Sequence, residues 1–101
     1  MAPVLTQHAD RSRFVIPPRV STQHARELRA QVQQALRQGQ RSLTIDCAAW
    51  TQVDVSMLSS LIQCASACEQ QGASLRVANV SHQIEADVRA LRLDDRLGIR
   101  A

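Results

Sequence analysis

The chain has 101 residues, a length typical of one domain, and 45% of them are apolar, which argues against intrinsic disorder. Its 12 Lys-plus-Arg positions are all arginine, and its formal net charge is +3. The arginines are scattered along the chain, and aromatic residues make up 2% of it. Both features argue against nucleic-acid binding, which uses basic clusters and aromatic rings that stack on bases.

The N-terminal residues lack the apolar segment of a signal peptide, and no stretch has the roughly 20 apolar residues that span a bilayer. The cysteines, Cys47, Cys64 and Cys68, lack the paired spacing of a zinc site. We therefore expect a cytoplasmic protein with reduced, buried cysteines and no direct membrane insertion.

Residues 1–13 are predicted to be a tail or to hold a short first strand at Val4–Thr6, and residues 14–101 to form a single domain. A strand is predicted at Phe14–Ile16, where Pro17 and Pro18 end it by removing two backbone donors. Further strands are predicted at Leu43–Cys47 and Leu75–Val80, and residues 52–54 are expected to be briefly extended.

Three helices are predicted between and after these strands. The first begins at Ser21 or Thr22 and ends near Gly39, the second runs from Ser56 to Gly72, and the third is capped by Ser81. Apolar residues recur at helical spacing on the inner side of each helix. They are Ala25, Leu28, Val32, Ala35 and Leu36 in the first, Leu58, Leu61, Ile62, Ala65 and Cys68 in the second, and Ile84, Val88 and Leu91 in the third.

Strands separated by helices require parallel crossover connections. The order of elements therefore predicts an α/β fold, with a small mostly parallel or mixed sheet of four to five strands and three to four helices. The C-terminal residues Leu93–Ile99 are expected to form a turn that returns apolar groups to the core.

Catalytic patterns are weak in this sequence. The 3 glycines lie far apart, so neither a Walker loop nor a dinucleotide fingerprint can form. Asp46 and Asp54 flank Trp50 and could form an acid pair, although loop solvation fits them better. His8, His24 and His82 are expected to be surface or capping residues. We expect no catalytic residue, no metal, no cofactor and no enzymatic activity.

The second predicted helix has an unusual surface. Between Ser56 and Gln70 its only charged residue is Glu69, and its outer sides offer small or weakly polar side chains. Such a face loses little free energy on desolvation, which suits it to docking against another protein. The alternative is that more of this helix is buried inside the domain.

Several of these motifs resemble the STAS domain family, which is shared by sulfate transporters and anti-sigma-factor antagonists. In this family a strand ends in Asp, and an Asp-Ser-Ser-Gly-Leu-like turn starts a helix. Ile45–Asp46 is similar to the strand end, and Val53–Leu58 is similar to the turn. Leu61–Ile62 is similar to the following helix, with further likeness at 72–81 and 91–97, so that the resemblance covers residues 14–99.

The resemblance implies a STAS-type regulatory module for protein–protein interaction in signal transduction, like an anti-sigma-factor antagonist. In that branch a serine directly after the Asp is phosphorylated and switches binding off. Here Val55 occupies that position and Met57 replaces the family glycine. Ser56 keeps a hydroxyl, for which we expect a capping role, with phosphorylation as the alternative. The departure favours a branch without this switch, which includes the cytoplasmic subunit of Mla-type phospholipid transporters.

We therefore expect the protein to dock a partner through the turn at residues 54–57 and the second helix. The partner would be an ABC transporter ATPase, a histidine-kinase-like anti-sigma factor or a chemosensory protein. A nucleotide-binding STAS protein is the alternative from another functional class. The predicted partner-binding residues are Asp54, Val55, Ser56, Met57, Ser59, Ser60 and Gln63.

Overall fold

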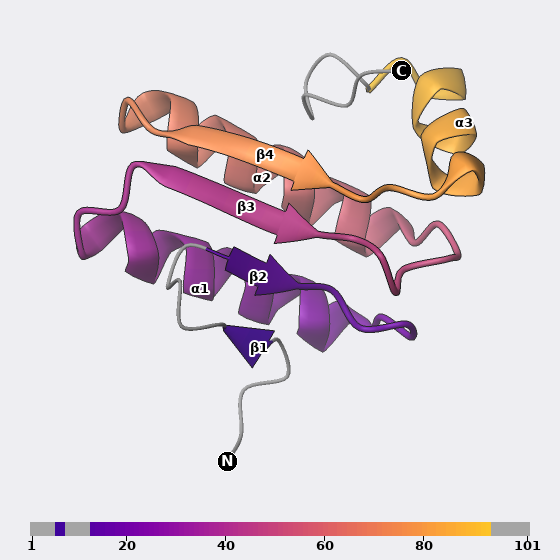
Figure 1. Cartoon of the computed structure of the whole chain (residues 1–101), viewed down its shortest axis with the longest axis horizontal. Coiled ribbons are helices and arrows are strands. Elements are labelled where there is room, and N and C mark those ends of the chain that lie inside the picture. Colours follow the sequence, from indigo (N-terminus) through magenta and orange to yellow (C-terminus); the bar gives the residue numbers. More distant parts are fainter. Residues whose placement is uncertain (1–5, 8–12, 94–101) are drawn as a thin grey trace.

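The computed structural model describes residues 6–7 and 13–93, which form one sheet and three helices. The sheet has the order β1-β2-β3-β4 (Figure 1). β2 (Arg13–Val15), β3 (Ser42–Asp46) and β4 (Ser74–Ala78) are parallel, and β1 (Thr6–Gln7) pairs antiparallel with β2. The predicted α/β fold with a small mixed sheet is confirmed.

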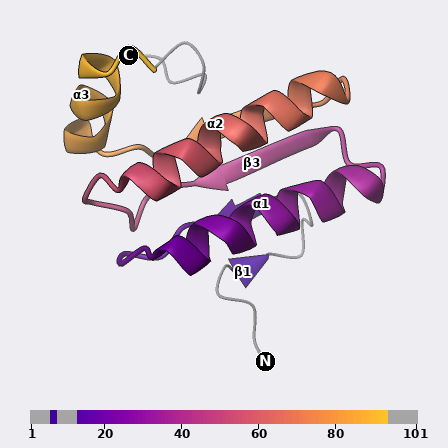
Figure 2. The same ribbon diagram turned by 180° about the vertical axis from the view of Figure 1, so that it is seen from behind.

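The two long helices, α1 (Thr22–Arg37) and α2 (Val55–Gln70), lie side by side on one face of the sheet (Figure 2). Successive right-handed crossovers in the order β2-β3-β4 place both helices on the same face. α3 (His82–Ala90) follows at the C-terminal end of β4. Among the described residues, no helix covers the opposite face of the sheet.

The core lies between the sheet and the two long helices. Along β3 the side chains of Leu43 and Ile45 are buried, while Thr44 between them faces the helix-free side. Ile45 pairs with Phe14 of β2 and with Val77 of β4, so that three adjacent strands present buried apolar groups to the helices. This alternation places the polar side chains of the strands on the other face.

Several predicted helix ends are confirmed. Ser21 caps α1 and Ser81 caps α3, because their hydroxyls accept hydrogen bonds from the third helical N–H. Gly39 and Gly72 follow α1 and α2 with φ of 91° and 71°, the left-handed conformation that glycine adopts without steric cost.

Other sequence-based expectations need correction. Leu91 was placed on the inner face of the third helix, but it follows α3 with 55% of its surface exposed. The predicted first strand at Val4–Thr6 overlaps β1 at Thr6, and its other two residues lie outside the described residues. Residues 52–54 were expected to be briefly extended, and Asp54 has an extended backbone with φ of −132° and ψ of 126°. Leu93 packs against the core as expected, whereas the rest of the predicted C-terminal turn lies outside the described residues.

Candidate functional site

The loop after β3 leads into α2 through a cap that differs from the predicted one. Asp54 is the N-cap, and its Oδ1 accepts a 2.9 Å hydrogen bond from the backbone N–H of Met57. Ser56 lies within the first turn of the helix, so the expectation that it caps α2 is wrong. Asp54 takes this role because its carboxylate also favours the positive end of the helix dipole.

The seven predicted partner-binding residues divide into a surface group and a buried group. Val55 is 78% exposed, Ser59 and Gln63 are exposed, and Asp54 and Ser56 are half-buried. Met57 and Ser60 are both 0% exposed, so their predicted place on the outer face is wrong. Their burial supports the alternative that more of this helix is packed inside the domain.

Ser60 has a structural partner on α1. Its hydroxyl donates a 2.6 Å hydrogen bond to the backbone carbonyl oxygen of Ala25. A small residue at both positions lets the helices approach closely, and the bond satisfies a hydroxyl that would otherwise be buried without a partner. Together the two residues hold α2 against α1 below the exposed turn.

The exposed turn borders a hollow of about 370 Å³ between the N-terminal halves of the two helices. α1 supplies Thr22, Ala25, Arg26 and Arg29, and α2 supplies Val55, Ser56 and Ser59. The sequence did not indicate Arg26 and Arg29 as site residues, because their position beside α2 depends on how the two helices pack. Their spacing of three on one helix flank was the only available signal.

Hydrogen bonds of Gln63 link α2 to α1 beside this hollow. The amide of Gln63 donates a 3.2 Å hydrogen bond to the Ser59 hydroxyl and accepts one of 3.4 Å from the Arg29 guanidinium. Both bonds are exposed and the second is long, so they stabilise the arrangement weakly. They nevertheless link two lining side chains, those of Ser59 and Arg29, through Gln63.

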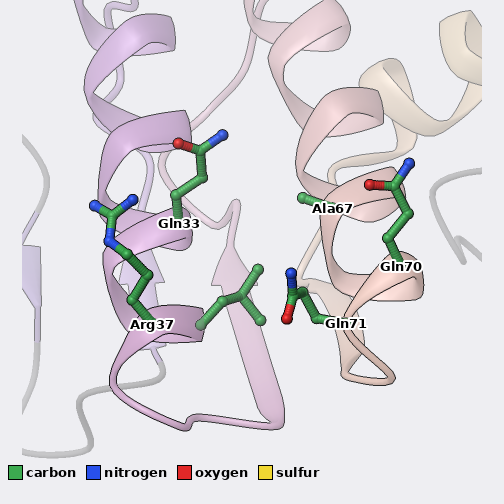
Figure 3. A pocket seen from close by; sticks show the side chains of 6 residues that line it. Gln33, Arg37, Ala67, Gln70 and Gln71 are labelled. Carbon is green, nitrogen blue, oxygen red and sulfur yellow. The ribbon is translucent and has the colours of Figure 1, made fainter.

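A second hollow of about 250 Å³ lies between the C-terminal halves of the same helices. Figure 3 shows its labelled lining residues, which are Gln33 and Arg37 of α1, Ala67 and Gln70 of α2, and Gln71 directly after α2. Leu36 completes the lining. The lining is therefore an apolar floor rimmed by amides and one guanidinium.

A comparison with known protein families identifies the family of this chain. The family model described as "Mlab, STAS domain" matches residues 6–100, which is nearly the whole chain. The chain belongs to the STAS domain family. Neither a curated protein nor a solved structure gives a significant match. The family signature predicted at Val53–Leu58 thus lies at the start of α2 in a STAS domain.

Asp46, at the end of β3 in this STAS domain, holds three segments together. Its Oδ2 accepts a 2.6 Å bond from Arg13 of β2, and its Oδ1 accepts bonds from the Ala48 N–H and the Asn79 amide. The Ala48 bond, followed by the Asn79 and Arg13 bonds, lowers the pKa of Asp46 despite its partial burial. The carboxylate therefore has a structural role, linking β3 to β2 and to the residue after β4.

The cysteines of the STAS domain are buried and free, as predicted. Burial raises the pKa of the Cys47 and Cys64 thiols to about 12 and also raises that of Cys68. Because the thiolate is the reactive form, these groups are held in an unreactive state.

The histidines lie at helix starts or outside the described residues. His24 accepts a 2.9 Å hydrogen bond from the Ser21 N–H through Nδ1, which completes a capping box at the start of α1. His82 is exposed at the start of α3, and His8 lies outside the described residues. Within the described segments, no group of at least three His, Cys, Asp or Glu residues is arranged to hold a metal ion. The same segments contain no helix long and apolar enough to cross a membrane.

Proposed function

We propose that this STAS domain is a non-catalytic regulatory module that docks a protein partner through the start of α2. The docking surface comprises Asp54, Val55, Ser56, Ser59 and Gln63, together with the adjoining part of α1. The observation that carries the proposal is Val55, an apolar side chain with 78% of its surface exposed at the first helical position of α2.

The environment of Val55 supports docking. Its neighbours from α2 in the hollow, Ser56 and Ser59, are uncharged and have small side chains, so they lose little free energy when water is removed, while α1 contributes the charged Arg26 and Arg29. An exposed apolar group next to these two serines is stabilised when a partner covers it. Buried Ser60 and Met57 support the surface from below and are not contact residues.

The proposed docking is constitutive, without a phosphoserine switch at position 55. Val55 has no hydroxyl, so the modification that the family resemblance implies cannot form there. Ser56 is the alternative acceptor, because Asp54 caps the helix and leaves the Ser56 hydroxyl free of that role. The test is incubation with a kinase encoded near this gene, followed by mass spectrometry. A mass gain of one phosphate that is lost in Ser56→Ala would show that docking is switched by phosphorylation and not constitutive.

The match to a family described by the name Mlab favours a cytoplasmic subunit of an Mla-type phospholipid ABC transporter, with the transporter ATPase as partner. The second candidate is an anti-sigma-factor antagonist or chemosensory adaptor, whose partner would be a histidine-kinase-like ATPase. The raised pKa values of the buried thiols and the capping role of His24 support a role without catalysis.

Nucleotide binding is less well supported. A phosphate-binding loop uses glycines at the N-terminus of a helix. The two described glycines with positive φ, Gly39 and Gly72, instead follow the C-terminal ends of α1 and α2. Isothermal titration calorimetry with ATP and with GTP should show no binding heat, and saturable heat would favour this class over docking.

The docking experiment compares purified ATPases of the same genome, one of the Mla type and one of the histidine-kinase type. Wild-type protein is expected to bind one of them, and Val55→Asp to bind it about tenfold more weakly. Leu91→Asp is the matched control, because Leu91 is the other large apolar side chain exposed among the described residues. Equal binding by wild type and Val55→Asp, or no binding of either ATPase, would contradict the proposal.

A further inference from the structure

The two helices form a continuous groove, which we call the α1–α2 groove. It consists of the hollow beside Val55, the hollow between the C-terminal halves, and a small hollow of about 30 Å³ between them. Arg29 lines both the first and the small hollow, and Gln33 and Ala67 line both the small hollow and the last. The groove therefore follows α1 over its 16 residues, or about 24 Å.

The charges along this groove are all of one sign. Arg26 and Arg29 line its N-terminal half and Arg37 lines its C-terminal half, while no lining residue is acidic. Arg29 and Arg37 donate hydrogen bonds to the neutral amides of Gln63 and Gln34, respectively. Three guanidinium groups in a lining that includes no acidic residue create a positive potential along the groove.

The floor of the groove is apolar. Ala25, Val32 and Leu36 of α1 are buried below its rim, and Ala67 of α2 is half-buried beside them. Val55 extends this apolar strip at the N-terminal end. An occupant that complements both features needs an apolar stripe toward the floor and carboxylates toward the rim.

We propose that the occupant of the α1–α2 groove is an acidic amphipathic helix of the protein partner. The inference rests on the proposed docking function and adds the partner's chemistry and the participation of α1. A helix of about 16 residues matches the length of the groove. Its carboxylates pair with Arg26 and Arg29, which present the bidentate donors that suit carboxylates.

The test measures the affinity of the full chain for whichever ATPase it binds, by biolayer interferometry at about 0.1 M salt. The groove variant is Arg26→Glu with Arg29→Glu. The matched control is Arg76→Glu with Arg92→Glu, which changes the net charge equally at two exposed sites outside the groove. Circular dichroism melting checks that both variants fold.

The groove variant is expected to lose at least about tenfold in affinity, and the control to lose less than about threefold. Raising the salt to about 0.5 M should weaken wild-type binding more than binding of the groove variant. Val55→Arg should bind more tightly than Val55→Asp, because both lose the apolar contact and only the second repels carboxylates. Equal losses in the groove variant and the control would overturn the inference, since net charge alone would explain them.

The outcomes separate this inference from the proposed function. If Val55→Asp loses binding and the groove variant keeps it, the proposed docking function stands and the proposal of an acidic helix in the groove is overturned. Full binding by both variants, or no binding to either ATPase, overturns both proposals. Two further results would assign the groove to another occupant and also overturn the inference. They are saturable binding of labelled duplex DNA and dimerisation seen by ultracentrifugation, provided that the groove variant abolishes the effect.

Discussion

The hydroxyl of Ser60 on α2 donates a 2.6 Å hydrogen bond to the backbone carbonyl oxygen of Ala25 on α1. This contact fixes the distance between the two helices beneath the hollow that Val55 borders. It makes Ser60 part of the foundation of the candidate site, and it explains why a serine on an apparently outer helix side is fully buried.

Replacing Ser60 by Ala should lower the free energy of unfolding by about 1 kcal/mol, because one buried hydrogen bond is lost. Urea denaturation followed by circular dichroism measures the change. Ser59→Ala is the matched control, since Ser59 is exposed and should change stability by less than about 0.5 kcal/mol. An unchanged midpoint for Ser60→Ala would show that the bond does not stabilise the helix pair.

The cap of α2 gives a second prediction. Asp54→Ala should destabilise the protein by about 1 kcal/mol, because the Met57 N–H loses its acceptor. Asp54→Asn keeps an acceptor and should retain most of the stability, while Ser56→Ala should change little. Thermal unfolding compares the three variants. A larger loss in Ser56→Ala than in Asp54→Ala would restore Ser56 as the cap.

The start of α2 illustrates what the sequence can and cannot predict. Asp54 and Ser56 are both good capping residues, and they lie two positions apart, so local pattern alone does not choose between them. The period of Leu58 and Leu61 does predict the helix itself, and the spacing of strands and helices predicts the sheet. Local patterns are informative here because backbone hydrogen bonding and burial follow the same periodicity.

The composition of the site was harder to predict because it depends on tertiary packing. Ser60 is small and polar and was expected outside, yet α2 packs against both the sheet and α1, which buries two of its sides. Arg26 and Arg29 resemble ordinary surface residues in sequence. Only the packing of α1 beside α2 brings them to the same hollow as Val55.

The anchor at Asp46 predicts a dependence on pH. Its pKa is lower in the folded chain than its usual value of 3.8, so the unfolded chain binds this proton more tightly. The stabilisation is fully present above the unfolded pKa and is lost as the pH falls through the folded value. Wild type should therefore exceed Asp46→Asn in stability by a constant margin above about pH 5, and the margin should shrink toward about pH 3.

Urea denaturation of wild type and Asp46→Asn across this pH range measures that margin directly. Arg13→Gln removes one of the bonds to the carboxylate and should reduce the pH dependence without abolishing it, because the Ala48 N–H and Asn79 remain. A margin that is the same at both ends of the range would contradict the lowered pKa.

The buried thiols predict low reactivity. With pKa values of about 12, Cys47 and Cys64 are protonated at about pH 8, and Cys68 is equally hidden from solvent. Iodoacetamide should leave the native protein unlabelled over minutes and should label all 3 cysteines in urea, as read by mass spectrometry. Rapid labelling of one native cysteine would reveal a thiol that is accessible or activated.

The most direct measurement of the docking surface is hydrogen–deuterium exchange of the full chain with and without the ATPase that binds it. We expect the partner to slow exchange in residues 22–33 of α1 and 54–67 of α2, which border the groove. Protection confined to β3, β4 or α3, with both groove segments unchanged, would contradict docking through the start of α2.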